Sequence, residues 1–148
     1  MATATSPATG FSGRSLPEKL GFKDGMAVAF IGLPAELEPL VQSAPFGRVV
    51  RTADWAEPLD AVGSLDAIHA FTRSRAEVEG DLSRLQDAIR RDGMIWVSWP
   101  KKASKVASDV TEDVVRDAAL KLDLVDIKVA AIDATWSGLK LMVRKDRR

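Results

Sequence analysis

Basic and hydroxyl-bearing side chains gather in three short segments of this sequence, beside two tryptophans. Residues 72–75 read Thr-Arg-Ser-Arg, residues 99–105 read Trp-Pro-Lys-Lys-Ala-Ser-Lys, and residues 133–137 read Asp-Ala-Thr-Trp-Ser. Arginine and lysine suit a phosphate or a carboxylate, and the face of a tryptophan suits a planar ring. These residue types therefore indicate a site for an anionic small molecule or a nucleotide.

A second interpretation explains the same side chains as parts of the fold, and the sequence favours it slightly. Ser74 stands where a helix cap is expected, and an aspartate such as Asp133 commonly forms a turn. The charges would then be a solvated rim and the tryptophans would pack in the core. The candidate ligand-binding residues under the first interpretation are Arg73, Arg75, Lys101, Lys102, Ser104, Lys105, Asp133, Thr135, Trp136 and Ser137.

The sequence supports no catalytic residue and no metal site. It contains no cysteine, which excludes disulfides, thiolate zinc sites, iron–sulfur clusters and cysteine nucleophiles. His69 is the only histidine, so a site with several histidine ligands is impossible. It falls inside an apolar segment, which indicates a structural side chain and not a general base.

The apolar run at residues 26–31 predicts a strand buried on both faces. A nucleotide cofactor would require a glycine-rich loop after it, but Gly32 is followed by Leu33 and then by Pro34, which has no amide. The acidic ribose ligand expected at the end of the next strand is also missing, because Asp54 comes late. Binding of S-adenosylmethionine or NAD in the familiar mode is therefore not expected, and no cofactor is predicted.

Strand and helix patterns alternate along the chain. Ser74 and Glu77 have the spacing of a capping box, as do Asp109 and Glu112, and each pair precedes an apolar stripe of helical spacing. The first of these helices should extend to about Gly93, and the second should bury Val114. Residues 53–64 show no clean period. Strands are predicted at residues 26–31, 47–52, 65–72, 94–99, 125–132 and 139–144. Two further helices are predicted at residues 15–20 and 35–43.

This alternation predicts an α/β fold: a three-layer, Rossmann-like open sheet of about six strands, mostly parallel, with helices on both faces. The short link between the last two strands predicts an antiparallel hairpin that closes the sheet. A sheet closed in this way resembles the class I methyltransferase form of the Rossmann-like fold. That resemblance implies the strand order 2-1-3-4-6-5.

The chain length suits one domain, predicted at residues 15–148. Residues 1–14 are rich in alanine, threonine, serine, proline and glycine, and predict a disordered tail. Lys plus Arg is 21 and Asp plus Glu is 21, so nucleic acid is not an expected partner. No apolar stretch is long enough to span a membrane, and a cytoplasmic location is the default expectation.

Four segments resemble a small bacterial family catalogued as a domain of unknown function, number three thousand and fifty-two. They are residues 20–25 (Leu-Gly-Phe-Lys-Asp-Gly), 71–75 (Phe-Thr-Arg-Ser-Arg), 92–102 (Asp-Gly-Met-Ile-Trp-Val-Ser-Trp-Pro-Lys-Lys) and 133–140 (Asp-Ala-Thr-Trp-Ser-Gly-Leu-Lys). The resemblance covers nearly the whole chain from about Ser15. It implies a bacterial, cytoplasmic protein and implies no particular activity.

Three functions are compatible with this sequence. The favoured hypothesis is a non-catalytic module that binds a small molecule or regulates, on a frame whose cofactor loop has degenerated. The first alternative is a divergent methyltransferase-like enzyme. The second is a protein-interaction domain that uses the tryptophans and the tail, with a protein partner or a second copy of the chain.

Overall fold

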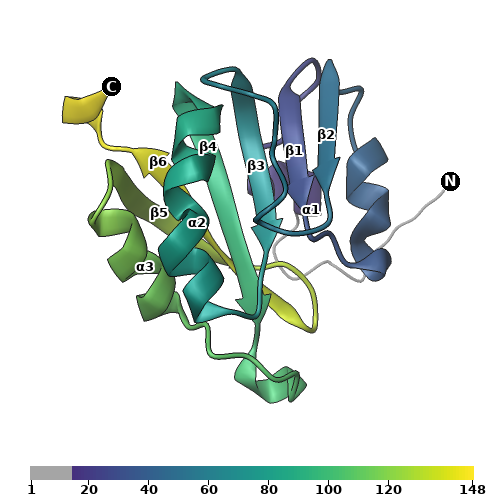
Figure 1. The fold of residues 1–148 in the computed structure, drawn as a ribbon. Helices are drawn as coiled ribbons and strands as arrows, with labels where there is room; N and C mark the ends of the chain where they lie inside the picture. The colour runs from purple at the N-terminus through teal and green to yellow at the C-terminus, as the bar shows by residue number, and fades with distance from the viewer. Residues whose placement is uncertain (1–14) are drawn as a thin grey trace, which may run out of the picture.

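The computed structural model describes residues 15–148, which form a twisted six-stranded sheet with helices on both faces (Figure 1). The strand order is β2-β1-β3-β4-β6-β5, with β2, β1, β3 and β4 parallel and β6 antiparallel to both neighbours. The predicted fold class and strand order are confirmed, whereas the predicted tail lies outside the described residues. The strands are β1 Ala27–Ile31, β2 Arg48–Thr52, β3 Leu65–Phe71, β4 Ile89–Pro100, β5 Leu124–Ala131 and β6 Trp136–Val143.

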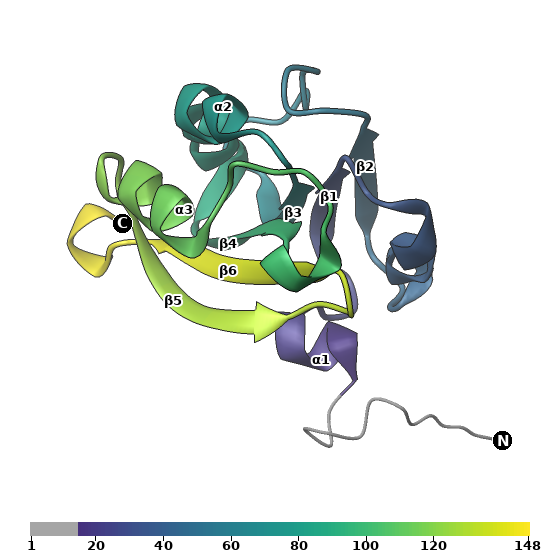
Figure 2. The same ribbon diagram turned by 90° about the horizontal axis from the view of Figure 1, so that it is seen from below.

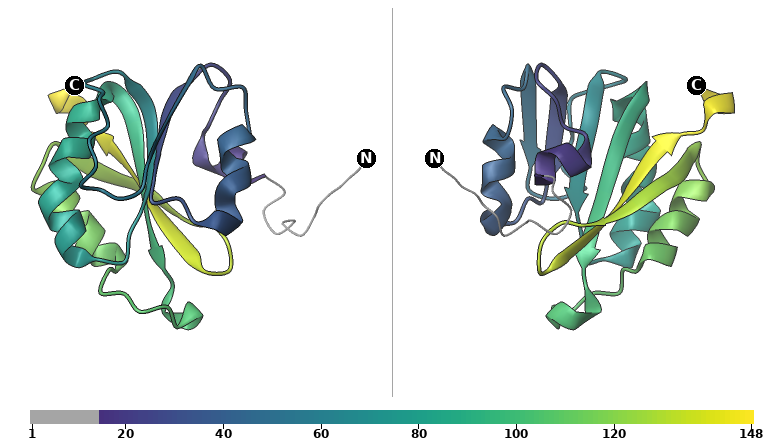
Figure 3. Two further views of the ribbon diagram at one scale, coloured as in Figure 1. Left: turned by 45° about the vertical axis from the view of Figure 1, so that its right-hand side comes forward. Right: turned by 180° about the vertical axis from the view of Figure 1, so that it is seen from behind.

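The sheet divides the core into two clusters, one on each of its faces. α2 and α3 cover one face of the sheet, and α1 lies on the opposite face (Figure 2). A 3-10 helix, η3, lies beside β2 at the edge of the sheet (Figure 3). None of the helices within residues 15–148 has the length and apolar character that a membrane span requires. The helices are α1 Leu16–Leu20, α2 Arg75–Ala88, α3 Glu112–Leu120, η3 Ala35–Gln42, η4 Lys102–Ser104 and η5 Lys145–Arg147.

Local sequence explains how the short helix α1 is fixed. The Ser15 hydroxyl accepts a hydrogen bond from the Glu18 amide, and the Glu18 carboxylate accepts one from the Ser15 amide. The two residues therefore form a complete capping box. Gly21 ends the helix in the left-handed conformation, with φ of 82°. The Leu20 carbonyl then accepts a hydrogen bond of 2.9 Å from the buried indole of Trp96, which ties α1 to the middle of β4.

The predicted boundary between α2 and β4 is wrong by five residues. α2 ends at Ala88, and Ile89 pairs with Leu65 as a residue of β4. The next pair is Ala67 with Met94, so β4 carries a large irregularity that includes Gly93. A Cβ at Gly93 would lie 3.0 Å from the Asp66 carbonyl oxygen, so the close approach of two backbones, and not a helix end, accounts for this glycine.

Two other predicted helices differ in detail. The cap of α3 is Thr111, whose hydroxyl accepts the Val114 amide, while the Asp109 carboxylate accepts the Arg75 amide at the start of α2. This later start turns Val115 into the core instead of Val114. The helix at residues 35–42 is 3-10, and Pro39 within it lacks the amide that an α-helix would use there.

Replacing Gly138 by alanine should destabilise the fold by about 1–3 kcal/mol, because the added methyl group overpacks the core. Its Cβ would lie 2.8 Å from the Ser98 Oγ, 3.0 Å from an Ile132 methyl and 3.1 Å from the Trp96 ring. Urea unfolding measures the change. Gly80→Ala is the matched control: it meets no atom within 4 Å in the middle of α2, so it should stabilise slightly. Equal stability of the two variants would contradict this account of the packing.

Candidate functional site

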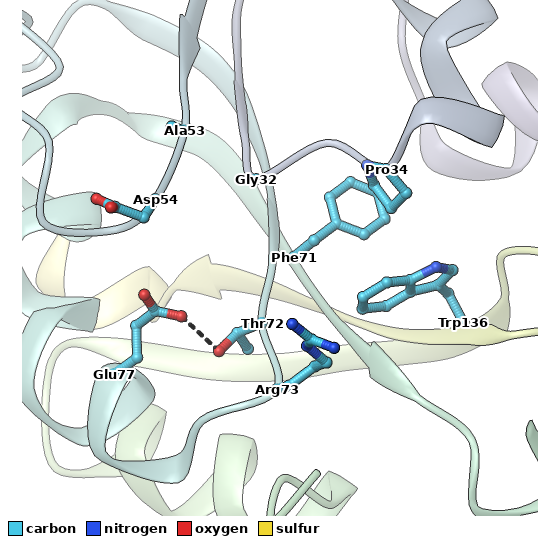
Figure 4. A pocket seen from close by; sticks show the side chains of 9 residues that line it. All are labelled: Gly32, Pro34, Ala53, Asp54, Phe71, Thr72, Arg73, Glu77 and Trp136. Atoms are coloured by element: carbon cyan, nitrogen blue, oxygen red, sulfur yellow. Dashed lines mark hydrogen bonds between the residues drawn. The ribbon is translucent and has the colours of Figure 1, made fainter. Parts of the chain in front are cut away.

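A cavity of about 280 Å³ opens at the carboxyl ends of the parallel strands (Figure 4). It lies where the strand order reverses between β1 and β3, the place where open α/β sheets bind ligands. Four strands contribute to its walls, because the residues come from the ends of β1, β2 and β3 and from the start of β6. Its lining residues are Gly32, Pro34, Ala53, Asp54, Phe71, Thr72, Arg73, Glu77 and Trp136.

Two aromatic rings form the apolar wall of the cavity. Phe71 and Trp136 meet edge to face with ring centroids 5.2 Å apart, and the six-membered ring of Trp136 points toward Phe71 and Arg73 (Figure 4). Trp136 is only 9% exposed, and its indole Nε1 is buried with no hydrogen-bond partner among the described residues. An unpaired buried donor costs free energy, and this nitrogen lies on the side of the indole that faces away from Phe71 and Arg73 (Figure 4).

The polar wall is built around the start of α2. The Ser74 hydroxyl accepts the Glu77 amide, as predicted for a helix cap, but the Glu77 carboxylate does not close the capping box. The Glu77 carboxylate instead accepts a 2.6 Å hydrogen bond from the Thr72 hydroxyl. The same Thr72 oxygen accepts a hydrogen bond from the Ser74 amide. This exchange of partners holds the Glu77 carboxylate at the cavity (Figure 4).

Asp54 lies on the other side of the cavity, two residues beyond the end of β2. One of its carboxylate oxygens accepts the amides of Ala56 and Glu57, which makes Asp54 the cap of its own loop. Trp55 anchors this loop: its side chain is fully buried and its indole donates a 3.0 Å hydrogen bond to the Phe71 carbonyl. The position of Asp54 thus depends on the packing of Trp55.

The turn after β1 is tightly packed against its own chain. Gly32 has φ of 65°, and a Cβ there would lie 3.1 Å from the Phe71 carbonyl oxygen. The Gly32 amide donates to the Thr52 carbonyl, and Pro34 has no amide, so these two positions offer a ligand no hydrogen-bond donor. The turn therefore differs from a glycine-rich loop whose amides surround a phosphate.

A second, wider cavity of about 590 Å³ adjoins the first and shares Gly32 and Ala53 with it. Arg51 lines this cavity and binds both carboxylate oxygens of Glu38, at 2.5 and 2.6 Å. The hydrogen bond to Arg51 lowers the pKa of Glu38 and raises the pKa of Arg51. Both groups are therefore charged at neutral pH.

The structure brings Arg73 and Trp136 together in the first cavity, whereas the other predicted residues near the hairpin have structural partners. The Lys101 ammonium donates to the Asp133 carbonyl and the Lys101 amide donates to the Thr135 carbonyl, each at 2.7 Å. The Asp133 carboxylate accepts the amides of Thr135 and Trp136, which makes it a turn former. Ser137 lies in the β-ladder, between Trp99 and Ala131.

The remaining predicted residues do not line either of these cavities. Arg75 is exposed on α2 and pairs with Glu79 at 2.8 Å. Lys102 and Ser104 lie in η4, and Lys105 follows it with φ of 61°. The Ser104 hydroxyl donates to the Lys101 carbonyl and so closes this turn.

The sequence did not single out Asp54, Glu77 or Phe71 as ligand-binding residues. Asp54 follows β2 too late for the familiar acidic position, and Glu77 was accounted for by the capping box. Phe71 lies inside the strand predicted at residues 65–72. One signal was available for two of them, since Phe71 and Asp54 each lie within two residues of a strand's carboxyl end.

His69 lies behind the aromatic wall and not in the cavity. Its ring stacks on Phe71 with centroids 4.2 Å apart, and its Nε2 is 2.7 Å from the Ser98 Oγ. Complete burial lowers the pKa of His69 to about 3, so the ring is neutral at physiological pH. The prediction that His69 is a structural residue inside a strand agrees with this position.

Solved structures of methyltransferases share this fold. The TehB-like SAM-dependent methyltransferase from Corynebacterium glutamicum has a TM-score of 0.63 at 10% identity, over 87% of this chain and 85% of that one. The B. subtilis tRNA methyltransferase TrmK has a TM-score of 0.62 at 12% identity, over 87% of this chain, which spans 64% of the enzyme's length.

A third structure is the Burkholderia thailandensis 1,6-didemethyltoxoflavin-N1-methyltransferase with bound 1,6-didemethyltoxoflavin and S-adenosylhomocysteine. It has a TM-score of 0.57 at 15% identity, over 88% of this chain and 75% of that one. No family model and no curated protein sequence matches this chain. The fold is therefore that of the Rossmann-like SAM-dependent methyltransferases, and membership of the bacterial family named above stays a prediction.

Proposed function

We propose that this chain is a divergent methyltransferase-like protein that binds S-adenosylmethionine or a close analogue in the 280 Å³ cavity. One observation carries the proposal: the cavity opens between β1 and β3 on a sheet with the strand order of SAM-dependent methyltransferases. Side chains of both charges and two aromatic rings meet there. The cavity thus offers contacts for the charged, polar and planar parts of this cofactor.

The side chains that line the cavity fit this cofactor. The Asp54 and Glu77 carboxylates are acceptors for ribose hydroxyls or an ammonium group, and the Arg73 guanidinium suits a carboxylate. The faces of Phe71 and Trp136 suit a planar base or a sulfonium cation. When bound, the cofactor would supply an activated methyl group.

Side chains, and not backbone amides, would provide most of the binding energy here. Gly32 and Pro34 offer no free amide, whereas Asp54, Arg73 and Glu77 bring charged side chains to the cavity. Single side-chain replacements in the cavity should therefore weaken binding strongly.

Replacing Arg73 by alanine should weaken binding of S-adenosylmethionine and S-adenosylhomocysteine by roughly 10- to 100-fold, because it removes a charged hydrogen-bond donor. Isothermal titration calorimetry measures the affinity. Arg75→Ala is the matched control, since Arg75 is two residues away, pairs with Glu79 and does not line the cavity. Its affinity should equal that of the wild-type protein.

Two results would count against the proposal. If neither compound binds the wild-type protein at millimolar concentration, the cavity is not a site for this cofactor class. If Arg73→Ala and Arg75→Ala reduce affinity equally, the effect comes from general charge and not from the cavity.

A non-catalytic, ligand-binding domain is the second candidate, and the hydrogen bonds of the two carboxylates favour it. One Asp54 oxygen accepts two loop amides, and one Glu77 oxygen accepts the Thr72 hydroxyl, so each group already has a structural task. Incubation with methyl-labelled S-adenosylmethionine and extracted small molecules and RNA separates the candidates. Binding without formation of S-adenosylhomocysteine supports the second one.

A further inference from the structure

Charge pairing in this protein separates arginine from lysine. Within residues 15–148, every side-chain ion pair shorter than 4.0 Å has arginine as its cation. Arg116, for example, binds Glu112, Asp113 and Asp126 on the side of α3. These three carboxylates thus share one arginine as their ion-pair partner. The lysines of the described chain are left without a carboxylate at ion-pair distance.

Three of these lysines come together beside α1. Lys140 on β6 stands opposite Lys128 on β5 in the antiparallel ladder, so the two side chains leave the sheet on one face as neighbours. Lys23 lies in the link between α1 and β1, two residues after Gly21, where an added Cβ would be 3.9 Å from the Lys140 Nζ. Burial, followed by the positive charges of Lys128 and Lys23, lowers the pKa of Lys140.

Lys140 is held in this place by its surroundings. Its other ladder partner is the fully buried Trp96 on β4, and its ammonium would lie 3.9 Å from a Cβ at Gly21. The left-handed glycine that ends α1 thus leaves room for the lysine. Figure 2 shows α1 on this face of the sheet, away from α2 and α3.

Ordinary structural roles account for only part of this cluster. A lysine on an edge strand such as β5 discourages pairing with other sheets, which explains Lys128. A long side chain can also cover apolar surface with its stem, which explains the lower part of Lys140. Neither role explains why Lys140, on an interior strand, brings its charge next to two others, because like charges opposite each other destabilise a sheet.

We propose that Lys23, Lys128 and Lys140 bind a compact, multiply charged anion of the phosphate class. Three neighbouring ammonium groups match the charge of a phosphate monoester or a pyrophosphate, and each supplies up to three hydrogen-bond donors. The balanced net charge of the chain favours such a compact anion over an extended polyanion. None of the three lysines lines the cavity at the strand ends, so this is a separate binding function.

Calorimetry with pyrophosphate at low salt tests this site. Lys140→Gln and Lys128→Gln should each weaken binding roughly tenfold, since each removes one charged contact. The matched control is Lys121→Gln, because Lys121 is exposed at the end of α3. Without anion, Lys140→Gln should melt no lower than the wild-type protein, because it relieves repulsion.

Either of two results would overturn the site: no binding of pyrophosphate by the wild-type protein, or equal losses in Lys140→Gln and Lys121→Gln. An oligoribonucleotide with and without a 5′-phosphate identifies the source of the anion. Preference for the phosphorylated oligonucleotide over pyrophosphate assigns the anion to a nucleic-acid end, and the opposite preference assigns it to a free small molecule. Binding that ignores the 5′-phosphate and exceeds that of pyrophosphate would overturn the compact-anion assignment.

Discussion

Acidification from pH 6.5 toward pH 3 should destabilise this protein by several kcal/mol more than a variant that lacks His69. The imidazole is completely buried, and burial lowers its pKa to about 3 from the ordinary value of 6.5. The unfolded chain therefore takes up a proton that the folded protein excludes. Stability contributed by the neutral ring is complete above pH 6.5 and is lost as the pH falls toward 3.

The size of this effect follows from the difference between the two pKa values. Each unit corresponds to about 1.4 kcal/mol, so the whole interval amounts to an upper bound of about 5 kcal/mol. His69 Nδ1 also lacks a hydrogen-bond partner among the described residues, so no acceptor is placed to receive the proton that this nitrogen would gain. Burial is therefore the cause that lowers the pKa of this ring.

Urea unfolding at several pH values, compared between the wild-type protein and His69→Phe/Ser98→Ala, measures this effect. The double variant removes both members of the His69–Ser98 hydrogen bond, which leaves no unpaired partner and keeps an aromatic ring against Phe71. Carboxylates titrate equally in both proteins, so the difference belongs to the histidine. Parallel stability curves from pH 7 to pH 3 would contradict the effect.

Replacing Trp55 by alanine should cost about 3–5 kcal/mol of unfolding free energy, because it empties a fully buried site. The change also removes the hydrogen bond from the indole to the Phe71 carbonyl. Since Asp54 precedes Trp55 in the same loop, the variant should also weaken ligand binding at the cavity.

Chemical denaturation and calorimetry measure the two effects of the Trp55 variants. Trp55→Phe retains most of the buried ring but not the hydrogen bond, and should fall between the alanine variant and the wild-type protein. Val62→Ala, in the same loop but 88% exposed, is the control and should change stability by less than about 0.5 kcal/mol. A Trp55→Ala protein as stable as this control would show that the loop needs no anchor.

The sheet could be predicted from sequence because its central strands are continuous apolar runs. Val28 to Ile31 and Ala67 to Phe71 are buried along their whole length, as expected for parallel strands covered on both faces. The order of the last two strands came from fold resemblance. The boundary at Ile89 could not be predicted, because this residue continues the apolar stripe of α2 while its backbone already pairs with Leu65.

The candidate site could be predicted only in part. Arg73 and Trp136 were found because an arginine suits an anion and a tryptophan face suits a planar ring, and both line the cavity. Glu77 was missed because its spacing from Ser74 predicts a capping box, whereas its carboxylate accepts a hydrogen bond from the Thr72 hydroxyl at the end of β3. The lysine cluster was missed for a related reason: Lys23 and Lys140 are 117 positions apart in sequence, and only the docking of α1 on the sheet brings them together.

The strand order has a consequence for synthesis on the ribosome. β6 is the last strand to be made, yet it lies between β4 and β5, which are made earlier. Until residues 136–143 have emerged, β5 has no strand neighbour and one edge of β4 is open. Ile95 and Val97 stand on that open edge, so the nascent chain presents an apolar strand that chaperones would need to shield.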